Sequence, residues 1–279
     1  MKALFDQVTE DYSELVTRRY STSFSSAVRM LHTSIRQDIY NIYGFVRMAD
    51  EIVDSFHEYD RERLFNRFEK DLDRALTEKI SLNPALNSFQ HTVHKYNIDL
   101  ELVEDFMKSM RMDLFKIDYE TQTDYENYIH GSANVVGLMC LKVFLKGDND
   151  QYEKLKEPAI RLGSAFQKVN FLRDLKHDQG VLNRSYFPSV EDNTITDEIK
   201  EKLILEIEKD FDIAYQGIIN LPHTAKFGVY TAYCYYKRLL SKLKRTPSRE
   251  LKEKRIRVGN HIKLGLLAKS YIFSKLKLV

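Results

Sequence analysis

The sequence predicts an all-α protein that forms a single domain over residues 1–279. The chain has only ten Gly and five Pro, and 30% of its residues are charged, a composition that favours long uninterrupted helices. No stretch of useful length alternates apolar and polar residues with the period of two that is typical of strands. Helix start and stop signals recur along the chain. Because 43% of the residues are hydrophobic, a substantial core can form.

The first half of the chain is predicted to form a series of capped helices. A helix is expected from Leu4 to Arg19, and Ser21 or Ser23 can cap the next one. The stretch from Phe24 to Phe56 contains no proline and one glycine, which predicts one or two long helices. Later helices are expected to begin at Asp60, at Asn83-Pro84, at Asp99 and at the capping box Thr123-Asp-Tyr-Glu126, the last ending at Gly147.

The second half begins with an expected helix from Pro158 to Gly180. Three further helices are expected, from Thr196 to about Asn220, from Pro222 to about Arg245, and, strongly basic, after Pro247-Ser248. Four tyrosines of the helix after Pro222 are more typical of core packing than of an active site: Tyr230, Tyr233, Tyr235 and Tyr236.

One face of the helix expected after Pro158 carries a row of polar residues. Steps of three, four and four residues place its members on one side of a helix: Gln167, Asn170, Asp174 and Asp178. The residues around the row are too apolar for an ordinary exposed helix, so the row is expected to face the interior. Carboxylates and amides in the interior need a partner, and a metal cation is the natural one.

A second row lies earlier in the chain, on a helix that is also apolar on several sides: Tyr40, Tyr43, Arg47, Asp50 and Asp54. Two aspartates four residues apart repel each other, more strongly when buried, so a positive charge must offset them. Mg²⁺ prefers oxygen ligands and is usually held by one or two carboxylates together with substrate phosphates. The structural alternative is that the Arg-x-x-Asp spacing forms a helical salt bridge and nothing more.

Together the two rows predict a diphosphate site across a helical cavity. Arg47 and Arg173 can take the remaining phosphate charge, with Arg29 or Lys168 as further candidates. Metal and arginine would stabilise the negative charge that develops when diphosphate leaves a carbon chain. The carbocation left behind needs a dry wall without nucleophiles, for which the aromatic candidates are Phe24, Tyr43, Phe166 and Phe171.

The net charge of +2 conceals an uneven distribution. From Lys237 to Val279 there are 14 Lys and Arg against 2 Asp and Glu, whereas the preceding residues have 29 against 39. Because apolar residues are interleaved, this basic C-terminal region can rest on an anionic membrane surface. A solvated helix packed on the body by one face is an equal alternative. Nucleic acid binding is not expected, since the acidic body would repel phosphates.

Cysteine content and the N-terminal residues predict a cytoplasmic protein. Cys140 and Cys234 each lie in an apolar run and are expected to be buried free thiols in a reducing compartment. The N-terminal residues lack an apolar signal core. No apolar run approaches the roughly 20 residues that span a bilayer, so peripheral contact is the only membrane contact expected.

Both aspartate rows and three further elements resemble, in the same order, motifs of the squalene/phytoene synthase family. The matching elements are Ser21-Thr-Ser23-Phe24; Tyr43-Gly-Phe-Val-Arg47-Met-Ala-Asp50-Glu-Ile-Val-Asp54; Met112-Asp113-Leu114 with Tyr128-Ile-His-Gly-Ser-Ala-Asn-Val-Val136-Gly137; Leu162 to Asp178; and Arg184-Ser-Tyr186-Phe-Pro188. The resemblance implies the isoprenoid synthase fold with a central helical cavity. It also implies that two identical allylic prenyl diphosphates are joined head to head through a cyclopropylcarbinyl diphosphate.

The resemblance also implies a role for each site residue. The metal ligands, for Mg²⁺ with Mn²⁺ as an alternative, are implied to be Asp50, Asp54, Asp174 and Asp178. The substrate-binding residues are implied to be Ser21, Phe24, Arg47, Gln167, Asn170 and Arg173. Tyr43 and Tyr128 are implied to lie by the reacting carbons.

The chain departs from the family pattern at two places. Ser132-Ala133-Asn134 replaces the usual Val-Ala-Gly after the tyrosine, and Tyr20 stands where a His commonly precedes the first Ser. These changes spare the aspartates and bear on the shape of the central cavity, and so on the length of substrate accepted.

Phytoene synthesis from two C20 geranylgeranyl diphosphates, without a reductant, is the leading expectation, because the chain shows no C-terminal membrane anchor and has a compact length that suits a bacterial carotenoid enzyme. The alternative joins two C15 farnesyl diphosphates to dehydrosqualene, hydroxysqualene or, with NADPH, squalene. A family-derived scaffold without catalysis is a second alternative, but it predicts eroded metal ligands. Head-to-tail synthases and terpene cyclases are disfavoured, because their Asp-Asp-x-x-Asp appears only as Asp50-Glu51-x-x-Asp54.

Overall fold

The computed structural model describes residues 1–115, 119, 121–180, 195–259, 262–263 and 265–266, with the side chains of 177–180 excepted. All regular structure in these residues is helical, as predicted. The helices are α1 (Lys2–Tyr20), α2 (Thr22–Val28), α3 (Thr33–Asp54), α4 (Arg61–Glu78), α5 (Pro84–Tyr96), α6 (Leu100–Met112), α7 (Gln122–Ile129), the π-helical turn η1 (His130–Asn134), α8 (Val135–Leu145), α9 (Asn149–Gly180), α10 (Asp197–Ile218), α11 (His223–Arg245) and α12 (Ser248–Leu251).

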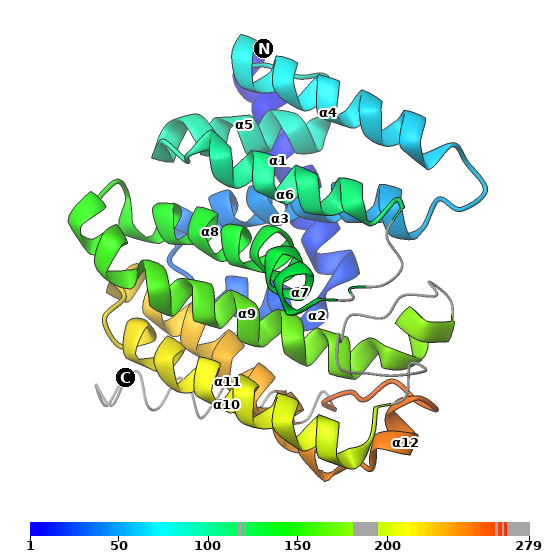
Figure 1. The fold of residues 1–279 in the computed structure, drawn as a ribbon. Coiled ribbons are helices and arrows are strands. Elements are labelled where there is room, and N and C mark those ends of the chain that lie inside the picture. Colours follow the sequence, from blue (N-terminus) through cyan, green and yellow to red (C-terminus); the bar gives the residue numbers. More distant parts are fainter. Residues whose placement is uncertain (116–118, 120, 181–194, 260–261, 264, 267–279) are drawn as a thin grey trace.

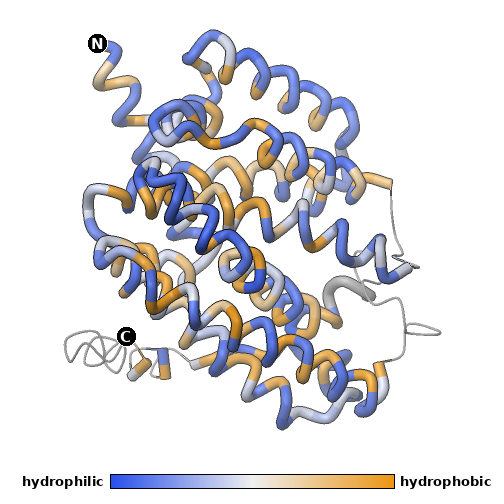
Figure 2. Tube along the Cα trace, turned by 60° about the vertical axis from the view of Figure 1, so that its left-hand side comes forward, coloured by the Kyte–Doolittle hydropathy of each residue, from blue (hydrophilic) through white to orange (hydrophobic). Residues whose placement is uncertain are grey.

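The long helix α9 crosses the molecule and separates two groups of helices (Figure 1). It packs against α8 on one side and against α10 and α11 on the other. One hydrophobic cluster joins α3 to α6 and α8, and within it Phe45 stacks on Phe89 with ring centres 3.9 Å apart. A second cluster joins α9, α10 and α11. Along the outer helices hydrophilic and hydrophobic residues alternate, as expected where one face is buried (Figure 2).

Four of the predicted helix starts are confirmed by side-chain caps. The Ser21 hydroxyl accepts a hydrogen bond from the Phe24 amide at 3.3 Å and so opens α2. Asp60, Asn83 and Thr196 cap α4, α5 and α10 in the same way. Each cap satisfies an amide that has no partner inside its own helix.

Two of the predicted caps differ from the structure in detail. Asp99 is the N-cap residue of α6, as predicted, but its carboxylate makes no capping bond and instead pairs with Lys142 of α8 at 3.0 Å. The box at Thr123 is displaced by two residues, because Thr121 caps α7 and its hydroxyl accepts from the Asp124 amide at 3.1 Å. Several Thr and Asp residues near one helix start satisfy the same local pattern, and packing selects among them.

Pro158 does not open the helix that carries the second aspartate row. The helix begins nine residues earlier, after Gly147 (φ +90°) ends the preceding turn, and Asp148 accepts from the Gln151 amide at 3.0 Å. Pro158 therefore lies inside α9. Gly217 of α10 packs directly against it, since a Cβ at Gly217 would lie 2.3 Å from the Pro158 Cβ. The predicted end at Gly180 is confirmed.

The helix after Pro247, α12, is four residues long, and among the described residues that follow it helical conformation returns only at 262–263 and 265–266. Beyond α12 the chain runs without regular structure through residues 255–259. Leu251 and Ile256 are both buried in the second hydrophobic cluster, so this segment is held by its apolar side chains rather than by a helix.

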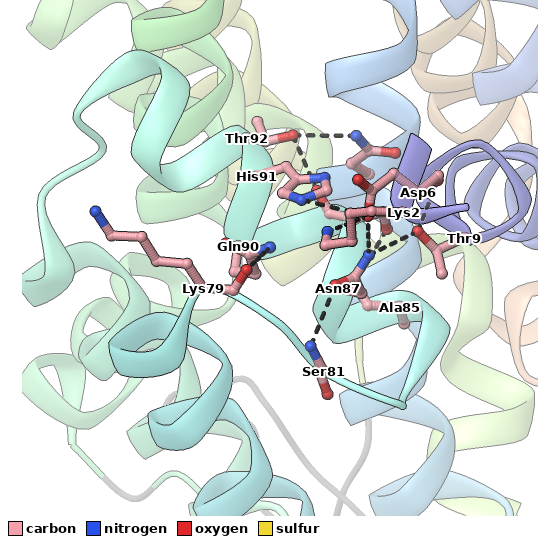
Figure 3. A network of polar contacts seen from close by, with 12 residues as sticks. Lys2, Asp6, Thr9, Lys79, Ser81, Ala85, Asn87, Gln90, His91 and Thr92 are labelled. Atoms are coloured by element: carbon pink, nitrogen blue, oxygen red, sulfur yellow. Dashed lines mark hydrogen bonds and ion pairs between the residues drawn. The ribbon is translucent and has the colours of Figure 1, made fainter. Parts of the chain in front are cut away.

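A polar network fixes α1 to α5 (Figure 3). The Asn87 amide donates to Asp6 at 3.1 Å and to the Thr9 hydroxyl at 3.0 Å, and its oxygen accepts from the Ser81 amide at 3.1 Å. The buried Asn87 side chain is thereby satisfied, and the N-terminal helix is held beside α3, which carries the first aspartate row.

By length and composition alone one helical run, Gln122–Leu145, could cross a membrane, contrary to the sequence expectation. However, 56% of its most apolar window is buried inside the molecule, as in the core helix of a globular protein. Neither Cys140, within this run, nor Cys234 forms a disulfide, as predicted, but each is only half-buried.

Candidate active site

An apolar cavity of about 280 Å³ lies among α2, α3, α8, α9, α10 and α11. Besides the tyrosines Tyr43 and Tyr236, its polar lining includes Ser132, Gln167 and Asn170, which come from η1 and α9. The opposite end is marked by Phe144 of α8 and Leu155 of α9. With a rise of 1.5 Å per residue, the lining extends about 18 Å along η1 and α8 from Ser132 to Phe144. The predicted central cavity is therefore present.

The first aspartate row lies on α3, and the residue of the row that faces the cavity is Tyr43. Tyr43 lines the cavity and stacks on Phe24 of α2 with ring centres 4.9 Å apart. Burial raises the pKa of the Tyr43 hydroxyl to about 12, although Arg47 and a hydrogen bond with Ser21 oppose the rise. Ser21, Phe24, Tyr43 and Arg47 are thus brought together, as the sequence predicted.

Arg47 binds the acidic residues at the C-terminal end of this row. Its guanidinium donates to the carboxylates of Asp50 and Glu51 and lies over the Tyr20 ring, 4.4 Å from the ring centre. Tyr20, which replaces the usual histidine, therefore packs directly on a predicted diphosphate ligand.

The Asp50 carboxyl lies in a crowded acidic environment. Burial and the charges of Asp54 and Asp113 raise its pKa to about 7, although Arg47 lowers it. Asp113 belongs to neither row, because it stands alone after the end of α6, although the family resemblance includes the segment Met112-Asp113-Leu114. Its carboxylate accepts from the hydroxyl of Tyr128 at 2.9 Å and of Tyr119 at 3.3 Å.

Tyr128 lies beside the acidic end of the site rather than on the wall of the cavity. Only 4% of it is exposed, and its hydroxyl is bound to Asp113. Phe171, predicted as a cavity wall, stacks on Tyr128 in the second hydrophobic cluster and does not line the cavity either.

In the second row, on α9, the side-chain amides of Gln167 and Asn170 face the same cavity. The Gln167 amide donates to the Ser132 hydroxyl at 3.4 Å, and the Asn170 oxygen accepts from the hydroxyl of Tyr236 at 3.2 Å. Tyr236 also stacks on Phe166 with ring centres 3.9 Å apart. The expectation that the α11 tyrosines are all core residues is therefore wrong for Tyr236, which lines the cavity.

Asp174 is held between two arginines. Arg173 donates to it at 3.0 Å, and Arg255 from the C-terminal segment pairs with it at 2.7 Å. Although burial opposes the charged form, Asp174 raises the pKa of Arg173. Arg255 was missed because no helical row leads to it. The side chain of Asp178 and the Arg184–Pro188 loop lie outside the described residues.

Lys168 does not join the site. It is buried and pairs with Asp210 of α10 at 2.7 Å, on another side of α9. The departure at Ser132-Ala133-Asn134 also has a structural explanation. The Asn134 oxygen accepts from Ser164 at 2.9 Å, and Gly163 lets α9 approach, since a Cβ there would lie 2.9 Å from the Ala133 oxygen. The substitution therefore forms part of the η1–α9 contact.

The residues present fit a hard divalent cation. Asp50, Asp54 and Asp113 supply carboxylate oxygens, and the mutual repulsion evident in the raised pKa of Asp50 would be relieved by a cation. Within the described part of the chain, no group of three or more acidic, His or Cys side chains is already arranged as a metal site. Instead, Arg47 forms an ion pair with Asp50 of the first row, and Arg173 forms one with Asp174 of the second.

A helical bundle around an apolar cavity, with carboxylates, amides and arginines at one end, has the architecture of the helical prenyltransferases. The family model "Squalene/phytoene synthase" matches residues 17–261. The chain belongs to the squalene/phytoene synthase family, a family of prenyltransferases.

Named relatives and solved structures agree with this family. The chain is 27% identical over 248 residues to phytoene synthase 1, chloroplastic, of Solanum lycopersicum, covering 82% of this chain and 59% of the relative. It is 27% identical to the 15-cis-phytoene synthase of Synechococcus elongatus, covering 84% and 83%. The chain spans less than two thirds of the length of three plant phytoene synthases, those of Solanum lycopersicum, Arabidopsis thaliana and Oryza sativa.

The fold is confirmed by two crystal structures. A dehydrosqualene synthase superimposes with a TM-score of 0.82 at 20% identity, covering 97% of this chain and 98% of that one. A squalene synthase from Alicyclobacillus acidocaldarius gives a TM-score of 0.74 at 21% identity, covering 86% and 94%. The predicted isoprenoid synthase fold is thereby established.

Proposed function

We propose that the protein condenses two geranylgeranyl diphosphates head to head to phytoene, through a cyclopropylcarbinyl diphosphate, within one catalytic domain over residues 1–279. The observation that carries the proposal is that residues of both rows, Tyr43 of the first and Gln167 and Asn170 of the second, line one apolar cavity. Mg²⁺, or Mn²⁺ in its place, would be held by Asp50, Asp54, Asp174 and Asp178 and would supply positive charge to the departing diphosphate.

The chain's own residues would divide the remaining tasks. Arg47 and Arg173, now paired with carboxylates, would turn to the diphosphate oxygens and stabilise the charge that builds there. Gln167 and Asn170 would orient the head of the substrate at the cavity mouth. The interior is lined mainly by apolar side chains and offers aromatic faces to a carbocation, chiefly the stacked pairs Phe24–Tyr43 and Phe166–Tyr236.

Tyr128 would act from outside the wall of the cavity. Its hydroxyl donates to Asp113, whose charge in turn acts on Asp50. We therefore assign Tyr128 the role of positioning the acidic end of the site, beside the reacting carbons rather than in contact with the prenyl tails.

The choice of C20 substrates is supported by the names of the relatives, which are phytoene synthases of plants and bacteria. The alternative is the condensation of two C15 farnesyl diphosphates to dehydrosqualene, hydroxysqualene or, with NADPH, squalene. The non-catalytic scaffold is the least supported alternative, because both aspartate rows are intact in the sequence.

We also propose a cytoplasmic protein that touches the membrane peripherally through its basic C-terminal region. Prenyl diphosphates with long apolar tails partition into membranes, and a basic region attracts anionic lipid. No role in nucleic acid binding is proposed.

The test is to incubate purified protein with Mg²⁺ and either the C15 or the C20 diphosphate, with and without NADPH, and to identify the hydrocarbon. Phytoene from the C20 substrate is expected. Product from the C15 substrate alone would overturn the assignment of chain length. No product from either substrate would overturn the enzymatic proposal, provided that circular dichroism shows a folded helical protein.

A further inference from the structure

A basic pocket lies on the outer side of α11, away from the cavity. Its walls are Arg238, Ser241, Lys242 and Arg245 of α11 together with Arg257, Val258 and Ile262 of the C-terminal segment, and its volume is about 150 Å³. This volume is about ten times the ~10–15 Å³ that one water molecule needs, so a phosphate group fits. Tyr236 and Ala232 line the cavity from the opposite side of the same helix, so the two sites are separate.

Four cationic side chains meet at this pocket. Arg238, Lys242 and Arg245 share one face of α11 at steps of four and three residues, and Arg257 faces them from the other wall. Lys242 donates to the Arg257 carbonyl oxygen at 2.8 Å, which fixes the C-terminal segment on α11. Across the described residues, none of the four forms an ion pair with a carboxylate.

Other basic residues of α11 behave differently. Lys237 pairs with Asp212 at 3.8 Å and Lys244 pairs with Glu208 at 2.9 Å, both on α10. The helix therefore presents one basic face that α10 neutralises and one that stays uncompensated. The uncompensated charge extends further, because burial and the charge of Arg257 lower the pKa of Lys263.

We propose that this pocket binds a phosphate group, presented either by an anionic lipid headgroup or by free inorganic diphosphate. One guanidinium group can donate two parallel hydrogen bonds to two oxygens of a phosphate. The apolar wall formed by Val258 and Ile262 suits the carbon skeleton next to a lipid phosphate. Arg257 lies two residues after Arg255, which pairs with Asp174. A lipid held here would therefore place a membrane beside the segment that reaches the candidate active site.

This inference deepens the proposed membrane contact and does not depend on the condensation reaction. The test compares the double variant Arg238→Gln/Arg245→Gln with the control Lys237→Gln/Lys244→Gln, which removes the same charge from the same helix. Both are sedimented with vesicles of phosphatidylcholine, with and without phosphatidylglycerol. Each charge near an anionic surface contributes about a fivefold factor, so the pocket variant should lose about 25-fold in binding to anionic vesicles and the control markedly less.

A second arm titrates wild type and both variants with inorganic diphosphate in the presence of a chelator. Heat of binding that is lost only in Arg238→Gln/Arg245→Gln identifies the free anion as a ligand, and vesicle binding lost only in that variant identifies the lipid. Equal losses in the two double variants would show diffuse charge rather than a pocket and would overturn the proposal. So would failure of the wild-type protein to bind either probe. These readouts do not use activity, so they remain valid whether or not a hydrocarbon product is found.

Discussion

Replacing Asp50 with Asn is predicted to stabilise the metal-free protein while abolishing turnover. Burial and the charges of Asp54 and Asp113 hold the pKa of Asp50 at about 7, against the ordinary 3.8. A folded-state pKa that is raised above the unfolded value makes the ionised carboxyl destabilising above about pH 7, and this penalty fades as the pH falls. A shift of about three pKa units corresponds to about 4 kcal/mol of unfolding free energy. Because 31% of the side chain is exposed, screening reduces this to about 1–3 kcal/mol.

The assay is thermal unfolding in the presence of a chelator at two pH values. At about pH 8 the Asp50→Asn variant should unfold at a temperature a few degrees above that of the wild type. At about pH 5 the difference should shrink by more than half, because the wild-type carboxyl is then protonated in the folded state. Added Mg²⁺ should stabilise the wild type and leave the variant unchanged.

The control is Asp11→Asn, which removes one exposed carboxylate on α1. It should change stability by less than about 0.5 kcal/mol at both pH values. A variant at Asp50 that is less stable than wild type at about pH 8, or whose gain does not shrink at about pH 5, would refute the assignment of a repulsive acidic cluster.

Four further predictions follow from the structure. Asp174→Asn should lower kcat by at least about 100-fold with little change in unfolding temperature, and retained turnover would show that the second row is only structural. Tyr236→Phe keeps the ring stack but removes a hydroxyl that donates to the polar row, so kcat/KM should fall about tenfold; an unchanged value would remove this residue from the site. Phe144→Ala should raise the ratio of C20 to C15 turnover, measured by product analysis, and a fall in that ratio would place the closed end elsewhere. Lys168→Met leaves Asp210 buried without its main partner and should cost about 3 kcal/mol in urea unfolding, whereas a neutral result would mean that the buried pair contributes nothing.

The helices and both aspartate rows could be predicted because their causes are local. Steps of three and four residues decide which side chains share a helical face, whatever packs against it. Caps such as Ser21 and Asn83 are read from residues within three positions of each other. Pro158 was misleading because a proline that favours a helix start is also tolerated inside a long helix when a glycine of the next helix makes room.

The residues that contact the two rows without belonging to either come from single positions on different elements. Asp113 stands at the end of α6, Tyr236 lies on α11, and Arg255 lies in an irregular segment. None of them belongs to a periodic pattern with the aspartate rows. Each joins the site through a contact between residues far apart in the chain, such as the 2.7 Å pair of Arg255 with Asp174.

By itself the sequence determined the all-α class, the two acidic rows and the family resemblance, because periodicity and short motifs carry that information. Only the tertiary structure decided that the amides of α9 and the aromatic rings of α2, α3 and α11 enclose one cavity. It also decided how far that cavity extends toward Phe144, since depth depends on how side chains of several helices meet. The sorting of the basic residues on α11 into paired and unpaired faces was likewise decided by what packs against each face.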